Sequence, residues 1–223
     1  MTTKHHFDDV RRAVLAAALV HVPFDGWTAD TLRRAAKDAG VEQGLAELAF
    51  PRGPISLVDE FAKEMDRRML AALEAGDLAS LKIRERIIAG VRARLEALEP
   101  YREAERRAVG FLALPPHAPL GLKVLTRTVD AIWRAAGDRS ADFNYYTKRA
   151  LLAGVYSTTL AFWLQDDSEN HEESWAFLAR RVEDVMKIQK ARGKLESYAG
   201  KLPSPFALLR HLRDRRDGTL RAR

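Results

Sequence analysis

Apolar residues recur at intervals of three and four along most of this chain, which is the spacing of one face of an α-helix. Two rows show the spacing most clearly: Leu57, Phe61, Met65, Met69 and Leu73, then Ile83, Ile87, Val91, Leu95 and Leu98. No run alternates apolar and polar residues between turn residues, as a half-buried strand would. The sequence therefore predicts an all-α fold of about ten helices whose apolar faces form the core.

Proline, glycine and capping residues divide the helical pattern into three parts. Residues 1–75 are expected to form a helix-turn-helix-like unit and a connecting helix that begins at Pro54, a residue suited to the first helical turn. Residues 76–198 are expected to form a helical domain, in which Pro115 separates two helices. Residues 199–223 are expected to form a separate terminal helix.

The composition excludes several classes of protein. The chain has 223 residues and no cysteine, so a disulfide scaffold, a thiolate metal site and a cysteine nucleophile are excluded. No stretch approaches the ~18 consecutive apolar residues of a membrane span. The first residues carry the acids Asp8 and Asp9 and lack an apolar signal segment. We therefore expect a cytoplasmic protein.

The sequence contains no arrangement typical of a catalytic centre. Its six histidines show neither a His-x-x-x-His spacing nor a repeated Glu-x-x-His pattern on the predicted helices. It has no glycine-rich phosphate loop and no nucleophilic serine elbow. The acids between Asp166 and Glu173 fit the solvated start of a helix. We expect no catalytic residue and no metal site.

The first fifty residues contain the pattern of a helix-turn-helix unit. Thr28 can cap a second helix, and a turn at Gly40 precedes a short third helix. Together with Gly26-Trp27 and Phe50-Pro51, this order resembles the N-terminal domain of TetR-type regulators. A third helix that reads DNA needs donors for phosphates and guanine edges, yet residues 41–50 contain two acids and no Lys or Arg. We expect this shape without binding to nucleic acid.

The most distinctive string, AGDRSADFNYYTKR, covers residues 136–149. Asp142, Tyr145, Tyr146 and Arg149 within it fall at three- and four-residue spacing and can share one face of a helix. One interpretation is a capped helix with half-buried aromatic side chains. The other is a protein contact, because Tyr and Arg are enriched at binding hot spots.

This string, with Ile132-Trp133 before it and Trp175-Ala176-Phe177-Leu178 after it, closely resembles the family of the ninth protein of the coenzyme Q biosynthesis series. The resemblance implies a TetR-like fold that has lost DNA binding. It also implies a non-catalytic, often dimeric protein of ubiquinone biosynthesis. Members of that family hold an isoprenoid or a phospholipid in an apolar cavity. They deliver quinone intermediates to a di-iron hydroxylase that acts on the demethoxy-quinone.

The resemblance further implies a partner-binding surface around the string. The residues that inherit this role are Ile132, Asp142, Tyr145, Tyr146 and Arg149. The family often has Trp where this chain has Tyr145, a difference that keeps an aromatic contact.

A lipid cavity would need apolar walls from the helices between residues 79 and 190. The residues expected to line it are Leu122, Leu125, Val129, Val155, Phe162, Trp163, Phe177 and Leu178. An ordinary packed core could bury the same residues, so this expectation depends mainly on the resemblance. The expected ligand is a lipid or an isoprenoid quinone, and no other cofactor is expected.

The C-terminal residues combine positive charge with an apolar arc. Residues 201–223 carry seven basic and two acidic side chains, so they hold five of the six net positive charges of the chain. The residues expected to contact a membrane are Leu202, Phe206, Leu208, Leu209, Leu212, Arg213 and Arg216. A basic amphipathic helix suits anionic lipids, although a helix docked on its own body or on a dimer mate shows the same pattern.

These expectations combine into a lipid-binding accessory protein, a homodimer peripherally associated with the inner membrane, that presents quinone intermediates to the hydroxylase. The alternative is a ligand-responsive transcriptional repressor of TetR type. A repressor would bind duplex DNA with a steep dependence on salt. The acidic third helix and the basic tail both favour the lipid-binding protein.

Overall fold

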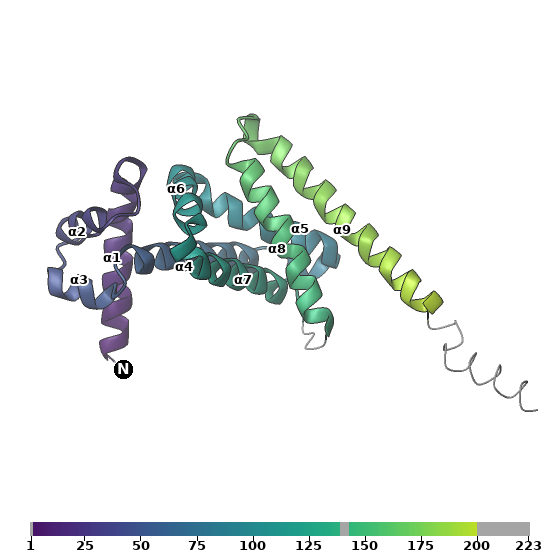
Figure 1. The fold of residues 1–223 in the computed structure, drawn as a ribbon, viewed down its shortest axis with the longest axis horizontal. Helices are drawn as coiled ribbons and strands as arrows, with labels where there is room; N and C mark the ends of the chain where they lie inside the picture. The colour runs from purple at the N-terminus through teal and green to yellow at the C-terminus, as the bar shows by residue number, and fades with distance from the viewer. Residues whose placement is uncertain (1, 139–142, 200–223) are drawn as a thin grey trace, which may run out of the picture. The chain divides into compact units, whose positions relative to one another are not determined.

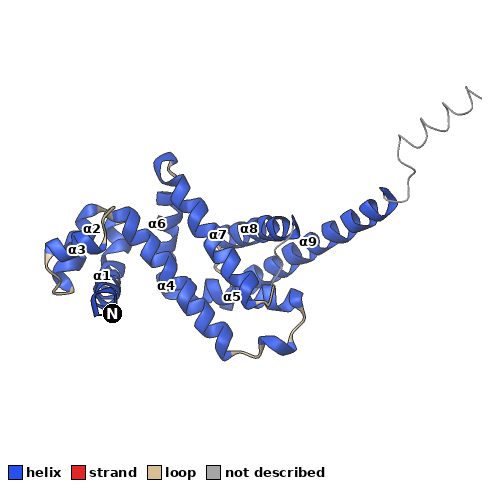
Figure 2. Ribbon diagram, turned by 90° about the horizontal axis from the view of Figure 1, so that it is seen from below, coloured by secondary structure: helices blue, strands red, loops and turns tan. Residues whose placement is uncertain are grey.

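The computed structural model describes residues 2–138 and 143–199, with side chains over residues 7–138 and 146–187. Within these residues every regular element is helical and none is a strand (Figures 1 and 2). The α-helices are α1 (Thr2–Asp25), α2 (Ala29–Asp38), α3 (Gln43–Ala49), α4 (Pro54–Ala75), α5 (Ile83–Leu98), α6 (Arg102–Ala113), α7 (Ala118–Ala135), α8 (Phe143–Trp163) and α9 (Glu172–Ala199). Short 3₁₀ helices cover Leu78–Ser80, Glu99–Tyr101, Pro115–His117 and Glu169–His171. The prediction of an all-α fold is confirmed.

The chain divides into two compact units. The first covers residues 1–179 and contains α1 to α8 with the start of α9. The second begins at residue 180, and the structure describes its helical residues as far as Ala199.

The helices α1, α2 and α3 form the helix-turn-helix-like part of the first unit. Gly26 follows α1 with a positive φ of 70°, and Thr28 caps α2 by accepting a hydrogen bond from the Thr31 backbone N–H at 3.1 Å. The buried Trp27 indole N–H donates to the Ala104 carbonyl oxygen in α6 at 3.1 Å. Trp27 therefore attaches this part to the helices that follow.

The long helix α4 packs against α1, α5 and α7. It begins at Pro54, as the sequence predicts. The predicted apolar row from Leu57 to Leu73 is buried along its length. The row on α5 is buried from Ile87 onward, whereas Ile83, the first residue of the helix, is 45% exposed.

The helices α5 and α7 approach each other closely at Gly90. A Cβ atom at this position would lie 2.6 Å from Ile132 Cγ2. Ile132 is fully buried and belongs to α7. This packing therefore requires a residue without a side chain at position 90.

Among the described residues, no single helix is long and apolar enough to cross a membrane. Two consecutive segments, Ile83–Ala113 and Pro115–Ala135, are together long and apolar enough for a broken membrane span, and they are bent by 96° relative to each other. This match is one of length and composition only.

Candidate functional site

A cavity of about 280 Å³ lies within the first unit and is lined by residues from α4, α5, α6, α7 and α8. We call it the α4–α8 cavity. Most of its lining side chains are apolar, and the largest of these include Phe61, Leu112, Leu125, Leu160 and Leu164. Such a cavity can exclude water from a hydrocarbon chain.

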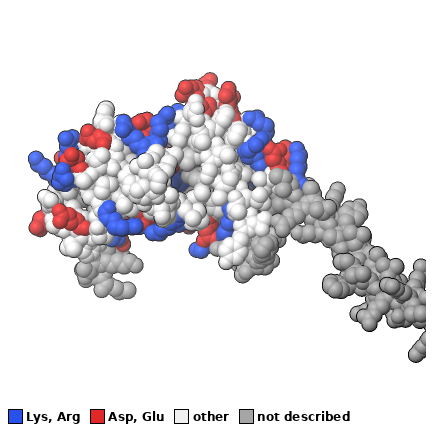
Figure 3. Space-filling model, in the orientation of Figure 1, with Lys and Arg blue, Asp and Glu red and all other residues white. Residues whose placement is uncertain are grey.

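The opening of the α4–α8 cavity is marked by lining residues that are exposed to solvent. Val109 and Ala113 contribute from α6, and Ser157 and Ala161 contribute from α8. Figure 3 shows a broad uncharged area across the face that includes α6, α7 and α8, with charged side chains gathered around its margin. An apolar ligand could reach the cavity across this area without displacing charged groups.

Three lining residues are polar and buried. They are Arg94 of α5, Glu105 of α6 and Tyr156 of α8. Arg94 is only 1% exposed, and its Nε donates to an Asp66 carboxylate oxygen at 3.1 Å. Its Nη1 atom has no hydrogen-bond partner among the described residues. One residue of the cavity wall is therefore a buried cation.

The Arg94 side chain belongs to a buried ionic network that joins α4, α5 and α7. Arg127 donates to Asp66 at 2.9 Å and to Asp59 at 2.7 Å. The Thr128 hydroxyl also donates to Asp66, at 2.7 Å. Asp66 therefore has cationic partners on α5 and α7, and Asp59 has them on α7 and on α4 itself. This satisfies the requirement that buried charges be paired.

The surroundings set the protonation of these acids in opposite directions. Burial opposes ionisation of Asp59, but the hydrogen bond from Arg127 and the charges of Lys63, Arg127 and Lys123 hold its pKa below the usual value. Burial raises the pKa of Glu105; Arg94 opposes this change, and Asp66 adds to it. Burial likewise raises the pKa of Tyr156. The ionised form is therefore less favourable for Glu105, and more favourable for Asp59, than for the same groups in water.

These buried polar residues are not among those that the sequence predicts for the site. Arg94 interrupts the apolar row of α5 between two residues that are buried with it, Ala93 and Leu95. Asp59 and Asp66 lie seven residues apart on α4, which places them on one face of the helix. Charged residues on otherwise apolar helical faces were therefore the sequence signal from which this buried polar group could have been predicted.

The predicted lining residues lie in several places within the first unit. Leu125 lines the α4–α8 cavity, whereas Leu122 is 64% exposed. Val129, Val155, Trp163 and Leu178 are buried but lie outside this lining. The rings of Phe162 and Phe177 stack on each other with centroids 4.7 Å apart. On α8 the cavity is lined instead by Tyr156, Ser157, Leu160 and Ala161.

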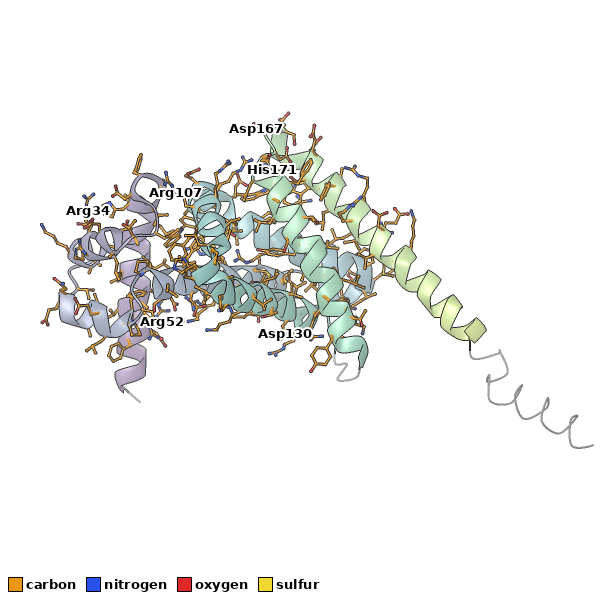
Figure 4. All side chains as sticks on the ribbon, in the orientation of Figure 1. Arg34, Arg52, Arg107, Asp130, Asp167 and His171 are labelled. Carbon is orange, nitrogen blue, oxygen red and sulfur yellow. The ribbon has the colours of Figure 1, made fainter. Side chains whose placement is uncertain are left out.

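The distinctive string forms an ionic junction between the end of α7 and the start of α8. Arg149 donates to Asp130 at 2.8 Å and to Asp138 at 3.3 Å, and Lys148 donates to Asp138 at 3.0 Å. The Trp133 indole N–H donates to the Lys148 carbonyl oxygen at 3.2 Å. We call these five residues the α7–α8 junction; Figure 4 labels Asp130 within it.

The predicted partner-binding residues have different environments around this junction. Ile132 is fully buried against Gly90, and Arg149 is mostly buried in its ion pairs. Tyr146 is 73% exposed. Tyr145 lies on the described backbone of α8, but its side chain lies outside the described residues, as does all of Asp142.

Comparison with known proteins identifies the relatives of this chain. The model of the COQ9 family matches residues 118–189. The human ubiquinone biosynthesis protein COQ9, mitochondrial, is 34% identical over 85% of this chain and 62% of its own length. The Xenopus laevis protein COQ9-B is 33% identical over 85% of this chain and 67% of its own length. The chain belongs to the COQ9 family. It spans about three fifths of the length of the human relative.

A solved structure shows the same fold as this COQ9-family chain. It is that of a TetR transcriptional regulator from Nitrosomonas europaea ATCC 19718, with a TM-score of 0.64 and 23% identity. The match covers 78% of this chain and 97% of the regulator. The prediction of a TetR-like fold is confirmed.

The helix-turn-helix-like part of this COQ9-family chain presents few unpaired cations. On α2, Arg33 pairs with Asp30, and Arg34 pairs with Asp25 at 2.9 Å; Figure 4 labels Arg34. The short helix α3 contains no Lys or Arg. Two of the cations available for phosphate contacts on α2 are therefore engaged by neighbouring acids.

Among the described residues, no group of three or more His, Asp or Glu side chains is placed to hold a metal ion.

The predicted membrane-binding residues all lie between residues 202 and 216, outside the described residues. Their role stays a prediction.

Proposed function

We propose that this chain is a non-catalytic accessory protein of ubiquinone biosynthesis. It binds an isoprenoid quinone intermediate or a phospholipid in the α4–α8 cavity and presents it to the hydroxylase that acts on the demethoxy-quinone. The observation that carries the proposal is the largely apolar cavity in a chain of the COQ9 family, whose human member is named a ubiquinone biosynthesis protein.

The size and lining of the cavity support a ligand with a hydrocarbon chain. Pockets for small ligands commonly measure roughly 300–1,000 Å³ and bury most of the ligand in apolar surroundings. A cavity of about 280 Å³ is just below this range. It can hold a head group with the first part of a chain, while the remainder extends through the opening near Val109 and Ser157.

The delivery step needs a contact with the hydroxylase and access to a membrane. We assign the contact to the α7–α8 junction and the exposed Tyr146 beside it, because Tyr and Arg recur at binding hot spots. We assign membrane association at the inner membrane to residues 199–223, which are basic and amphipathic in sequence. Removal of residues 203–223 should then weaken binding to anionic vesicles. We further propose that two copies of this chain form a homodimer.

The alternative, a DNA-binding repressor, gains support from the fold alone, and a fold does not determine function. The paired state of Arg33 and Arg34 and the composition of α3 favour the lipid-binding role. A repressor would bind fluorescent duplex DNA with an affinity that falls steeply between low and moderate salt.

Organic extraction of the purified protein, followed by mass spectrometry, tests the proposed function. We expect a quinone intermediate, another isoprenoid or a phospholipid at close to one equivalent. Leu125→Trp should reduce that yield several-fold because Leu125 lines the cavity. Leu122→Trp is the matched control, since Leu122 is exposed on the same helix. A clean extract from wild-type protein that also takes up no added quinone would contradict the proposal.

A further inference from the structure

The opening of the α4–α8 cavity lies between α6 and α8, and two arginines of α6 join these helices beside it. We propose that Arg102 and Arg106 are positioning residues whose hydrogen bonds to the backbone after α8 hold the opening narrow and limit the rate at which a ligand enters and leaves. We call these two residues the arginine latch. This inference rests on the proposed function, because it assumes that the cavity is the binding site, and it adds the control of ligand exchange.

The contacts of the arginine latch carry the first step. Arg102 Nη2 donates to the carbonyl oxygens of Trp163 at 2.8 Å and Asp166 at 2.6 Å. Arg106 Nη2 donates to the carbonyl oxygen of Leu164 at 2.5 Å. Carbonyl groups at the end of a helix lack partners within that helix, and basic side chains can satisfy them. The arginine latch therefore attaches α6 to the C-terminal end of α8.

This attachment lies next to the opening of the cavity. Leu164, whose carbonyl oxygen accepts from Arg106, lines the cavity, and so does Ala161, which is exposed at the opening. On α6, Val109 follows Arg106 by three residues, about one helical turn, and is exposed at the other side of the opening. The distance between α6 and the end of α8 therefore sets the width of the opening.

The two halves of α8 are attached to the first unit in different ways. The N-terminal half is held to α7 by the ion pairs of the α7–α8 junction. From there the helix continues without a break to the turn before α9 (Figure 1), and it lines the cavity with Tyr156, Ser157 and Leu160 on the way. Release of the arginine latch would therefore free the C-terminal end of α8 while its other half stays attached.

The two arginines differ in how readily they can release. Arg102 is only 24% exposed, and its guanidinium carbon lies 5.4 Å from the centroid of the Trp163 ring, a cation–π contact. The Arg106 side chain is 50% exposed, and its Nε lies 3.4 Å from a carboxylate oxygen of Glu103 on α6 itself. Water and Glu103 can thus replace the Leu164 carbonyl as partners of Arg106. We therefore assign the release step to Arg106.

Stopped-flow mixing of the full chain with decylubiquinone, followed by quenching of tryptophan fluorescence, tests the inference. Arg106→Ala should raise the association and dissociation rate constants about fivefold each. The dissociation constant should stay unchanged, because the arginine latch acts on the opening and not on the bound ligand. Arg106→Lys should keep rate constants close to those of wild type, since its ammonium group can still donate to a carbonyl oxygen.

Hydrogen exchange provides a second measurement that needs no ligand. In Arg106→Ala, the backbone amides of residues 160–166 should exchange faster than in wild type, because the end of α8 is no longer held to α6. The amides of residues 146–152 should keep their wild-type exchange, because the α7–α8 junction is intact.

The next residue on α6 provides the matched control. Arg107, labelled in Figure 4, donates to Glu103 within the same helix at 3.1 Å. Arg107→Ala should leave both rate constants unchanged. Wild-type rate constants in Arg106→Ala, the same acceleration in Arg107→Ala, or weaker binding without faster association would overturn the inference while retaining a ligand-binding cavity. A wild-type protein that binds no decylubiquinone would overturn the proposed function together with the inference.

Discussion

Arg94 illustrates how a single charged side chain can be accommodated in a helical core. Its guanidinium is removed from water, and the loss of hydration is compensated by Asp66 and by the wider network that reaches Arg127. Replacing one member of such a pair leaves the other buried and unpaired, which commonly destabilises a protein by about 3–5 kcal/mol. Arg94 is therefore a poor choice for testing binding, whereas Glu105 and Tyr156 can be changed conservatively.

Glu105 gives a prediction about pH. Burial raises its pKa in the folded state, so the folded protein holds this proton more tightly than the unfolded chain does. The associated stability is present below the unfolded pKa and is lost as pH rises through the folded pKa. Each pKa unit of difference corresponds to about 1.4 kcal/mol. Glu105→Gln should therefore gain stability relative to wild type as pH rises above 4.5, the ordinary pKa of this carboxyl.

Urea unfolding of both proteins at several pH values measures this difference. The stability of Glu105→Gln minus that of wild type should increase as pH rises above 4.5. A difference that stays constant with pH would show that the Glu105 carboxyl is not held in its neutral form by burial.

The helices themselves follow from the sequence because their ends are chemically marked. Pro54 begins α4, Thr28 caps α2, and the predicted apolar rows become buried faces. The face of α8 that lines the cavity could not be predicted in the same way. Leu152, Val155, Tyr156, Leu160 and Trp163 are all buried. Apolar residues occupy so much of this helix that its spacing does not distinguish the lining from the core.

The α7–α8 junction combines both interpretations of the distinctive string. Its aspartates hold α8 against α7 through buried or half-buried ion pairs, a structural role that residue spacing alone did not reveal. The same contacts leave Tyr146 exposed beside them. Pairing of Asp130 and Asp138 with Arg149 depends on how α8 packs against α7, which a sequence pattern does not specify.

The junction therefore predicts different outcomes for two substitutions. Tyr146→Ala should weaken binding of the hydroxylase about tenfold without changing the thermal unfolding midpoint, because the side chain is mostly exposed. Asp138→Ala should reduce both binding and stability, the latter by about 1–3 kcal/mol, because Lys148 and Arg149 lose a buried acceptor.

Surface plasmon resonance and differential scanning calorimetry measure these two quantities. Asp30→Ala removes a single exposed ion pair with Arg33 on α2 and should change neither by a measurable amount. Wild-type affinity in Tyr146→Ala would reject the junction as the hydroxylase contact.

The chain combines a TetR-like fold with membership of the COQ9 family. Within the first unit, the helix-turn-helix-like part retains its shape through Trp27 and the cap at Thr28. The α4–α8 cavity lies among later helices of the same unit. The proposed function therefore depends on the cavity and not on α3, the element that would read DNA in a regulator.

The central claim is that the ligand occupies the α4–α8 cavity. The most direct measurement uses a benzoquinone with a diazirine on its alkyl chain, crosslinked to the protein by light and located by peptide mass spectrometry. We expect adducts on the lining segments of α6, α7 and α8, which include Leu112, Leu125 and Leu160. These adducts should be lost when unlabelled quinone competes. Adducts confined to other parts of the chain, or unaffected by the competitor, would contradict this claim.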